Sequence, residues 1–172
     1  MLGDAQVTLP SYEATLGVTI DAAPMAIWPW LVQMGYRRGG LYSYDWLDRL
    51  FGYLDGPSAD RILPEWQRLA VGDEIPIGRK GGFPVRAIGP YRSLVMAGRD
   101  RDVEWSWELA LAPVGPARTR LVSRNRVWVR PTLRSRATMF LMEPAAFLMT
   151  RRMLLGIKQR AESMPMMERK AA

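Results

Sequence analysis

The chain has 172 residues, which is the size of one domain, and a formal net charge of +7. Hydrophobic residues make up 48% and charged residues 24%, as in ordinary globular proteins, so a disordered or fibrous chain is excluded. The sequence contains neither cysteine nor histidine, which excludes disulfides, thiolate zinc sites and imidazole bases and leaves any catalysis to carboxylates, Tyr, Ser, Lys or Arg.

The first half predicts one strand followed by short helices. Residues 14–20 are a short run of strand type. Apolar residues at helical spacing predict a helix over residues 25–34. Asp45 is placed to cap a second helix over residues 46–51, and a third helical turn is expected at residues 59–62.

Strands and turns follow. Residues 74–79 and 83–88 flank a Lys-Gly-Gly turn, which is typical of a hairpin, and a further strand is expected at residues 92–97. Residues 103–112 and 118–130 alternate apolar and polar side chains, so each predicts a long strand with one inward face. The sequence therefore predicts six strands.

The register of the last hairpin decides which face points inward. A five-residue loop pairs Leu109 with Leu121 and places the tryptophans on the inner face, whereas a four-residue loop pairs Trp105 with Arg124 and turns the arginines inward. A slip of one residue exchanges the two faces. Hydrophobic matching favours the first register.

The carboxyl-terminal part is expected to be helical. Pro144 suits a first helical turn, and strong helix formers continue over residues 145–162. Glu143 is expected to act at the positive end of this helix, and residues 136–142 are compatible with either helix or strand. The order of elements predicts an α+β fold with the helices on one side of a curved sheet.

Positive charge is concentrated in the second half of the chain. Residues 1–112 carry a net charge of −3 and residues 113–172 a net charge of +10. Such asymmetry permits binding to an anionic membrane or to nucleic acid, although a solvated arginine-rich face is the plainer interpretation. In the favoured hairpin register, Glu104 opposes Arg126 on the outer face.

The sequence shows no targeting or membrane-spanning segment. Residues 1–10 lack the apolar core of a signal peptide. Charged residues interrupt the apolar region 137–157 well before the ~20 residues that a transmembrane helix needs. We expect a soluble, cytoplasmic protein with a single domain over residues 1–172, a core at about residues 14–162 and flexible ends.

Four segments resemble one superfamily. They are residues 18–32 (VTIDAAPMAIWPWLV), 33–48 (QMGYRRGGLYSYDWLD), 61–76 (RILPEWQRLAVGDEIP) and 155–162 (LGIKQRAE). Together with the element order they resemble the START/Bet v 1-like superfamily, also called SRPBCC or polyketide cyclase-like. The more specific segments resemble a bacterial subgroup, from which no catalytic residue can be carried over.

This resemblance implies a helix-grip fold, in which a curved antiparallel sheet of six or seven strands wraps around a long carboxyl-terminal helix. Short helices are expected after the first strand. The resemblance also implies a hydrophobic cavity between the sheet and the long helix. Members of the superfamily use such a cavity for lipids, sterols, polyketides or other apolar small molecules, and fold alone does not choose among carriers, sensors and enzymes.

Aromatic and methionine side chains are the candidate walls of this cavity. Trp105 and Trp107 share one strand face and are predicted to form an aromatic wall. Met149 and Met153 are predicted to form an adaptable opposing wall, because methionine repacks readily. Plain core packing is the alternative for all four.

A polar and aromatic cluster supplies further candidate ligand-binding residues. Arg38 suits a ligand carboxylate or phosphate, and Tyr42 and Tyr44 supply hydroxyls on rigid apolar rings. Asp45 and Trp46 complete the cluster. The alternative is structural, with Asp45 capping a helix and pairing with an arginine while the tyrosines pack.

Glu65 is the remaining candidate, because a partly buried carboxylate beside an aromatic ring can have a raised pKa and act as an acid or base. An ion-pair role is its alternative. Carboxylates at metal-binding spacing are absent from the sequence, so we expect no metal and no cofactor.

We therefore expect a non-catalytic carrier or sensor, monomeric or homodimeric, that binds an apolar or amphipathic small molecule in an internal cavity. One alternative is a polyketide cyclase or dehydratase-like enzyme that uses Tyr and carboxylate groups. This alternative predicts a carboxylate of perturbed pKa inside the cavity. A second alternative is a protein that contacts a membrane peripherally, or nucleic acid, through its basic carboxyl-terminal half.

Overall fold

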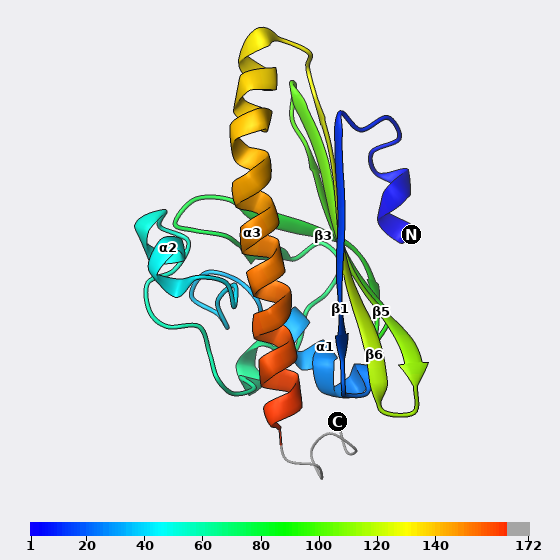
Figure 1. Cartoon of the computed structure of the whole chain (residues 1–172). Helices are drawn as coiled ribbons and strands as arrows, with labels where there is room; N and C mark the ends of the chain where they lie inside the picture. The colour runs from blue at the N-terminus through cyan, green and yellow to red at the C-terminus, as the bar shows by residue number, and fades with distance from the viewer. Residues whose placement is uncertain (165–172) are drawn as a thin grey trace.

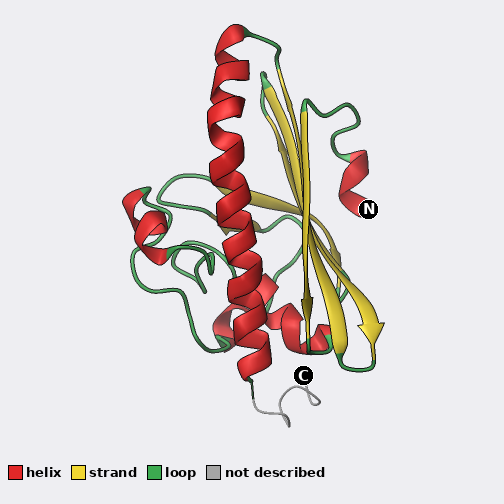
Figure 2. Ribbon diagram, viewed as in Figure 1, coloured by secondary structure: helices red, strands yellow, loops and turns green. Residues whose placement is uncertain are grey.

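A six-stranded antiparallel sheet lies against one long helix, α3, in the computed structural model, which describes residues 1–164 (Figures 1 and 2). The strand order is β1-β6-β5-β4-β3-β2. The predicted α+β architecture, with six strands, short helices after the first strand and a long carboxyl-terminal helix, is confirmed. Most of the flexible carboxyl-terminal end expected after residue 162, namely residues 165–172, lies outside the described residues.

The elements are these, in chain order: η1 (Leu2–Ala5), β1 (Tyr12–Ile20), α1 (Pro24–Val32), α2 (Asp45–Leu50), η2 (Pro64–Trp66), β2 (Glu74–Pro76), β3 (Gly82–Gly89), β4 (Ser93–Arg99), β5 (Val103–Gly115), β6 (Arg118–Val129) and α3 (Leu133–Ser163). Here η denotes a short 3₁₀ helix.

The β5–β6 hairpin has the predicted inner face but not the predicted register. Leu109 pairs with Ser123 instead of Leu121, and the ladder continues to the pair Gly115–Arg118, so the expected five-residue loop is wrong. The shift amounts to two residues, which leaves every side chain on its predicted face. Because the turn is shorter than the expected five-residue loop, the strand pairing continues past Ala112 to Gly115.

The outer face of this hairpin is paired differently from expectation. Glu104 opposes Trp128, not Arg126, and forms an ion pair with Arg99 at 3.0 Å. Arg126 instead lies within 3.2 Å of carboxylate oxygens of both Asp4 and Glu13.

The helix boundaries also bring corrections. No helical turn forms at residues 59–62; η2 begins at Pro64, whose ring favours a first helical position. Asp45 is the first residue of α2 and does not cap it, because its carboxylate accepts hydrogen bonds from Ser58.

The long helix starts earlier than expected. Thr132 is its N-cap and accepts a hydrogen bond from the Ser135 backbone N–H at 3.1 Å, so residues 136–142 are helical. Pro144 therefore lies inside α3, and Glu143 does not act at its amino-terminal end.

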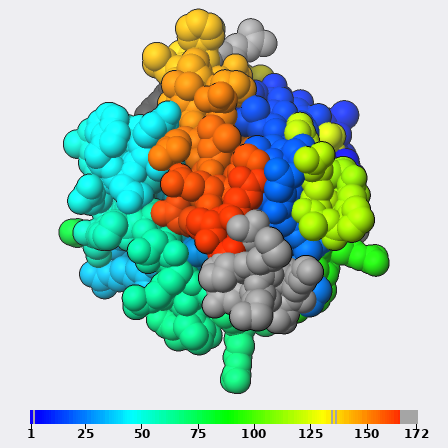
Figure 3. All heavy atoms as spheres, turned by 60° about the horizontal axis from the view of Figure 1, so that its bottom comes forward, coloured from blue at the N-terminus to red at the C-terminus, as the bar shows by residue number. Residues whose placement is uncertain are grey.

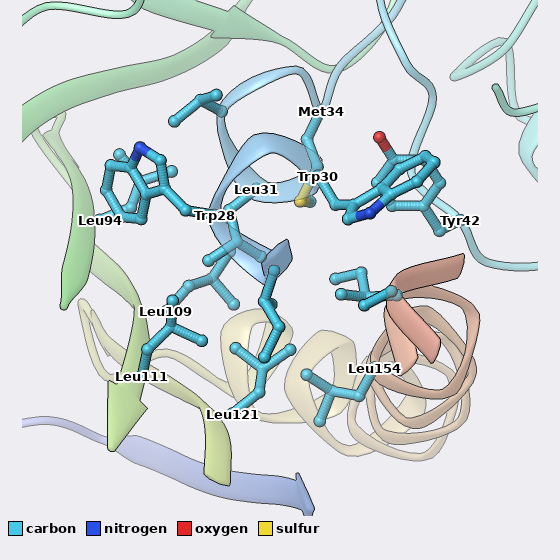
Figure 4. Packing of buried hydrophobic residues seen from close by; sticks show 14 of the residues in the cluster. Trp28, Trp30, Leu31, Met34, Tyr42, Leu94, Leu109, Leu111, Leu121 and Leu154 are labelled. Atoms are coloured by element: carbon cyan, nitrogen blue, oxygen red, sulfur yellow. The ribbon is translucent and has the colours of Figure 1, made fainter. Parts of the chain in front are cut away.

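The main core fills the space between α1, the second half of α3 and the sheet (Figure 4). Trp30 and Tyr42 meet edge to face at a centroid distance of 5.9 Å. Gly156 lets the loop that carries Tyr42 cross α3, because a Cβ at position 156 would lie 2.2 Å from the Tyr42 carbonyl oxygen. Figure 3 shows α3 between the segment that contains α2 on one side and β1 with the β5–β6 hairpin on the other.

Candidate ligand-binding cavity

A cavity of about 260 Å³ lies between the sheet and α3. Its walls come from β1, β3, β5, β6, α3 and the loops around residues 41–53 and 77, and most of them are apolar. The lining residues are Tyr12, Ala14, Leu16, Leu41, Ser43, Tyr53, Ile77, Phe83, Trp107, Asn125, Ala146, Phe147, Met149, Thr150 and Met153.

Two opposed walls define the shape of the cavity. On the sheet side, Trp107 meets Phe83 edge to face at a centroid distance of 5.2 Å. On the helix side, Met149 and Met153 line the space, as an adaptable wall would. Trp105 packs against the same Phe83 ring at 4.8 Å but does not line the cavity.

Few polar groups face the cavity. The Trp107 indole N–H donates to the Ser123 hydroxyl at 2.8 Å, so this donor is already used. Asn125 of β6 lies opposite Trp107 of β5 in the strand ladder. The side-chain amide of Asn125 forms no hydrogen bond with the described residues 1–164. The Ser43 hydroxyl lies at the limit of hydrogen bonding to the Met149 carbonyl, at 3.5 Å. The Asn125 amide is therefore a free polar group that lines the cavity on its sheet side.

Tyr12 lies at the edge of the cavity as a neutral phenol. Burial, with a smaller contribution from the nearby Glu143 carboxylate, raises the pKa of the Tyr12 hydroxyl above its ordinary value. No carboxylate, lysine or arginine of the described chain lines the cavity.

Most of the predicted polar cluster lines a second space, which adjoins this cavity at Ser43. Tyr42, Tyr44, Asp45 and Trp46 line a separate groove together with arginines of α2 and α3. We call it the arginine groove; its charged lining residues are Asp45, Arg49, Arg151, Arg152 and Arg160.

The side chains of this cluster are largely engaged in the fold. The buried Tyr42 hydroxyl accepts a hydrogen bond from Gln33 at 3.0 Å, and burial raises its pKa. Asp45 accepts from the Ser58 N–H at 2.9 Å and from its hydroxyl at 2.7 Å. Arg152 lies over the Tyr44 ring at 5.8 Å.

Arg38 and Glu65 line neither space. The half-buried Arg38 guanidinium donates to the Val32 carbonyl at 2.7 Å and lies 4.7 Å over the Trp66 ring. Desolvation lowers the pKa of Arg38. Glu65 is exposed on η2.

Several residues that line the cavity are not predicted from the sequence. Asn125 carried a usable signal, because alternation along β6 places it on the inner face, where a polar residue is unusual. Leu41, Tyr53 and Ile77 come from loops, where no periodic pattern marks the inward side.

Asp48 is the carboxyl whose environment is most unusual. It is a fully buried residue of α2, and neither of its carboxyl oxygens has a hydrogen-bond partner among the described residues. Burial, with a smaller effect from Asp45, raises the pKa of Asp48 to about 6. Asp48 does not line the cavity, so it does not supply the acid that the enzyme alternative predicts there.

Neither a metal cluster nor a membrane span is found in the described part of the chain. Residues 1–164 contain no group of three or more carboxylates placed to hold a metal ion. None of the described helices is both long enough and apolar enough to cross a bilayer.

A curved antiparallel sheet that grips one long helix is the helix-grip fold of the START/Bet v 1-like superfamily, and this chain has that fold. The resemblance predicted from the sequence is thus confirmed at the level of fold. No protein-family model matches the chain, and no curated protein matches it.

Several solved structures are similar to this chain. The Zhui aromatase/cyclase from a Streptomyces species is 15% identical, with 88% of this chain and 93% of that chain covered and a TM-score of 0.52. Norcoclaurine synthase from Thalictrum flavum is 12% identical, with coverages of 89% and 87% and a TM-score of 0.52. The Aha1 dimer from Colwellia psychrerythraea is 16% identical, with coverages of 88% and 97% and a TM-score of 0.53. At these identities the likeness concerns the fold alone.

Proposed function

We propose that this protein binds an apolar or amphipathic small molecule in the cavity between the sheet and α3, as a carrier or sensor without catalysis. The observation that carries the proposal is the apolar cavity itself, whose described lining holds no charged side chain. Transfer of apolar surface from water into such a space is favourable by about 25 cal/mol per Å².

The size of the cavity narrows the class of ligand. A volume of about 260 Å³ lies just below the range of roughly 300–1,000 Å³ that is typical of ligand pockets. It suits a small ring compound or one end of a longer amphipathic molecule. A polar end would lie toward the solvent or against the Asn125 amide.

The cavity lining favours binding over catalysis. Acid–base chemistry needs a group that changes its protonation within reach of the substrate. The described lining offers only tyrosine, serine and threonine hydroxyls and one amide. The names of the cyclase and the synthase among the similar structures describe those proteins, and the lining of this cavity supports no equivalent reaction.

Calorimetric titration with 2-naphthol tests the proposal, because this probe has a rigid apolar body and a single hydroxyl. We expect saturable binding to the parent protein. Ala14→Phe fills the cavity from β1 and should weaken binding at least about tenfold, which corresponds to roughly 1.4 kcal/mol. Ala112→Phe makes the same change at an exposed strand position and should bind like the parent.

Two results would count against the proposal. One is the absence of saturable binding to the parent protein. The other is equal binding by the two phenylalanine variants, since it would place the probe outside the cavity.

A further inference from the structure

Large apolar side chains are exposed on two helices, α2 and α3, that line one groove. Six of them, on α2 and α3, have between 54% and 88% of their surface exposed. We call this surface the apolar face; its residues are Trp46, Leu50, Leu133, Phe140, Leu141 and Leu148.

Helical spacing places the four α3 residues away from the sheet. Leu133 and Phe140 are seven residues apart, as are Leu141 and Leu148, so each pair shares one side of the helix over two turns. Residues of α3 that face the core, such as Met153, lie on the opposite side. In Figure 1, α3 lies in front of the sheet and α2 lies beside it.

Unpaired arginines border the apolar face. Arg49 of α2 and Arg151 and Arg152 of α3 line the arginine groove, which joins the two helices into one surface. None of the three forms an ion pair with a carboxylate of residues 1–164. Asp45, the carboxylate that lines the described groove, is held by Ser58.

The positive charge beside the apolar face favours an anionic lipid surface over a second copy of the chain as the partner of this face. In a two-fold contact with a second copy, the same patch meets itself, so these arginines would face one another without an acid to match them. An anionic lipid surface complements them, and each arginine near such a surface contributes about 1 kcal/mol. Apolar residues flanked by tryptophan and arginine are also the pattern of helices that lie in the membrane interface.

We propose that the apolar face docks on the surface of a lipid bilayer that contains anionic phospholipids. Docking is independent of the proposed cavity ligand. The two meet at the cavity mouth, where Phe147 lines the cavity and remains 46% exposed. Phe51, which is also exposed, packs against Tyr53 of the cavity lining at a ring distance of 6.0 Å. When the protein is docked through its apolar face, the mouth of the cavity would therefore lie close to the lipid.

Vesicle flotation of the full-length protein tests the docking. We expect binding to vesicles of phosphatidylcholine mixed with phosphatidylglycerol, and much weaker binding to phosphatidylcholine alone. Arg151→Gln and Arg152→Gln should each reduce binding to the mixed vesicles about fivefold. Leu141→Glu combined with Leu148→Glu should abolish it.

Leu9→Glu is the matched control, because Leu9 is 81% exposed and precedes β1, outside the apolar face. It should float like the parent protein. All variants should still bind 2-naphthol like the parent if the cavity binds it, so failure of docking and failure of the cavity proposal are measured separately.

Three results would overturn the docking proposal. The first is failure of the parent protein to float with the mixed vesicles. The second is a loss of binding in Leu9→Glu as large as in the paired glutamate variant. The third is a dimer in light scattering that Leu141→Glu dissociates, since the occupant of the face would then be a second copy.

Discussion

Asp48 is a buried carboxyl whose ionisation opposes folding. Its pKa is raised from the ordinary value of 3.8 to about 6 by burial and by the neighbouring Asp45 charge. Below about pH 4 it is protonated in both the folded and the unfolded chain. Between about pH 4 and 6 the unfolded chain loses this proton first, so the free energy of unfolding falls as pH rises, by about 3 kcal/mol in total.

Asp48→Asn should remove this pH-dependent loss. We expect the variant to exceed the parent protein in free energy of unfolding by about 1–3 kcal/mol at pH 8, and the excess to shrink toward pH 4. Urea unfolding at several pH values measures the difference. Asp60→Asn, at an exposed position, should leave the pH profile unchanged. A difference between Asp48→Asn and the parent that stays constant with pH would contradict the assigned ionisation.

Asn125 should select ligands that carry a hydroxyl or carbonyl group. Asn125→Leu keeps a similar size but removes the free amide of the cavity. We expect it to weaken 2-naphthol binding about fivefold to tenfold, as the loss of one hydrogen bond does, and to leave naphthalene binding equal or stronger. Competition calorimetry with the two probes measures this selectivity. An equal loss for both probes would show that Asn125 contributes shape rather than a hydrogen bond.

The β5–β6 hairpin shows what alternation predicts at the level of an element. The inner face followed from the positions of Trp107 and Leu109, because strand side chains repeat every two residues. The register did not follow, since a shift of two residues leaves that pattern unchanged. Ser123 contributes through its hydrogen bond to the Trp107 indole, which hydrophobic matching ignores.

The start of α3 shows how two local signals compete. Pro144 predicts a helix that begins near residue 144, but the capping pair at Thr132 begins it near residue 133. The exposed apolar residues at 140 and 141 then continue it outward from the sheet. A helix that begins at Pro144 leaves out Leu133, Phe140 and Leu141, so the helix predicted from the sequence does not indicate the apolar face.

Gly156 controls how closely α3 approaches the loop beneath it. Gly156→Ala would place a Cβ 2.2 Å from the Tyr42 carbonyl oxygen, so the helix or the loop must move. We expect the free energy of unfolding to fall by about 2 kcal/mol in a urea titration. Gly56→Ala, where an added Cβ meets no atom within 4 Å, should change it by less than about 0.5 kcal/mol. Equal effects at the two glycines would contradict this close packing.

At the scale of the whole molecule, the sequence indicates the cavity-lining residues that lie on strands and helices, but not those that lie on loops. Trp107, Met149 and Met153 lie on periodic elements, and the structure brings them together around one cavity. Leu41 and Tyr53 reach the same cavity from the loops before and after α2, and the path of the first loop depends on tertiary contacts such as the close approach of Tyr42 to Gly156. No local pattern specifies such a path.

The uneven distribution of charge along the chain is partly balanced in the folded structure by ion pairs between distant segments. On β6, Arg124 and Arg126 are matched by Asp4 and Glu13 from the amino-terminal part, so much of the charge predicted for one strand is neutralised locally. Arg49, Arg151 and Arg152, which form no ion pair with a carboxylate of the described residues, lie in the arginine groove. The basic surface to which the docking proposal assigns an anionic partner is on α2 and α3.

A crystal structure of the protein with 2-naphthol tests the central claim most directly. The account predicts the ring system between Trp107 and Met149, with its hydroxyl within hydrogen-bond distance of the Asn125 amide. Repacked side chains that close the cavity, or a probe bound only in the arginine groove, would contradict it.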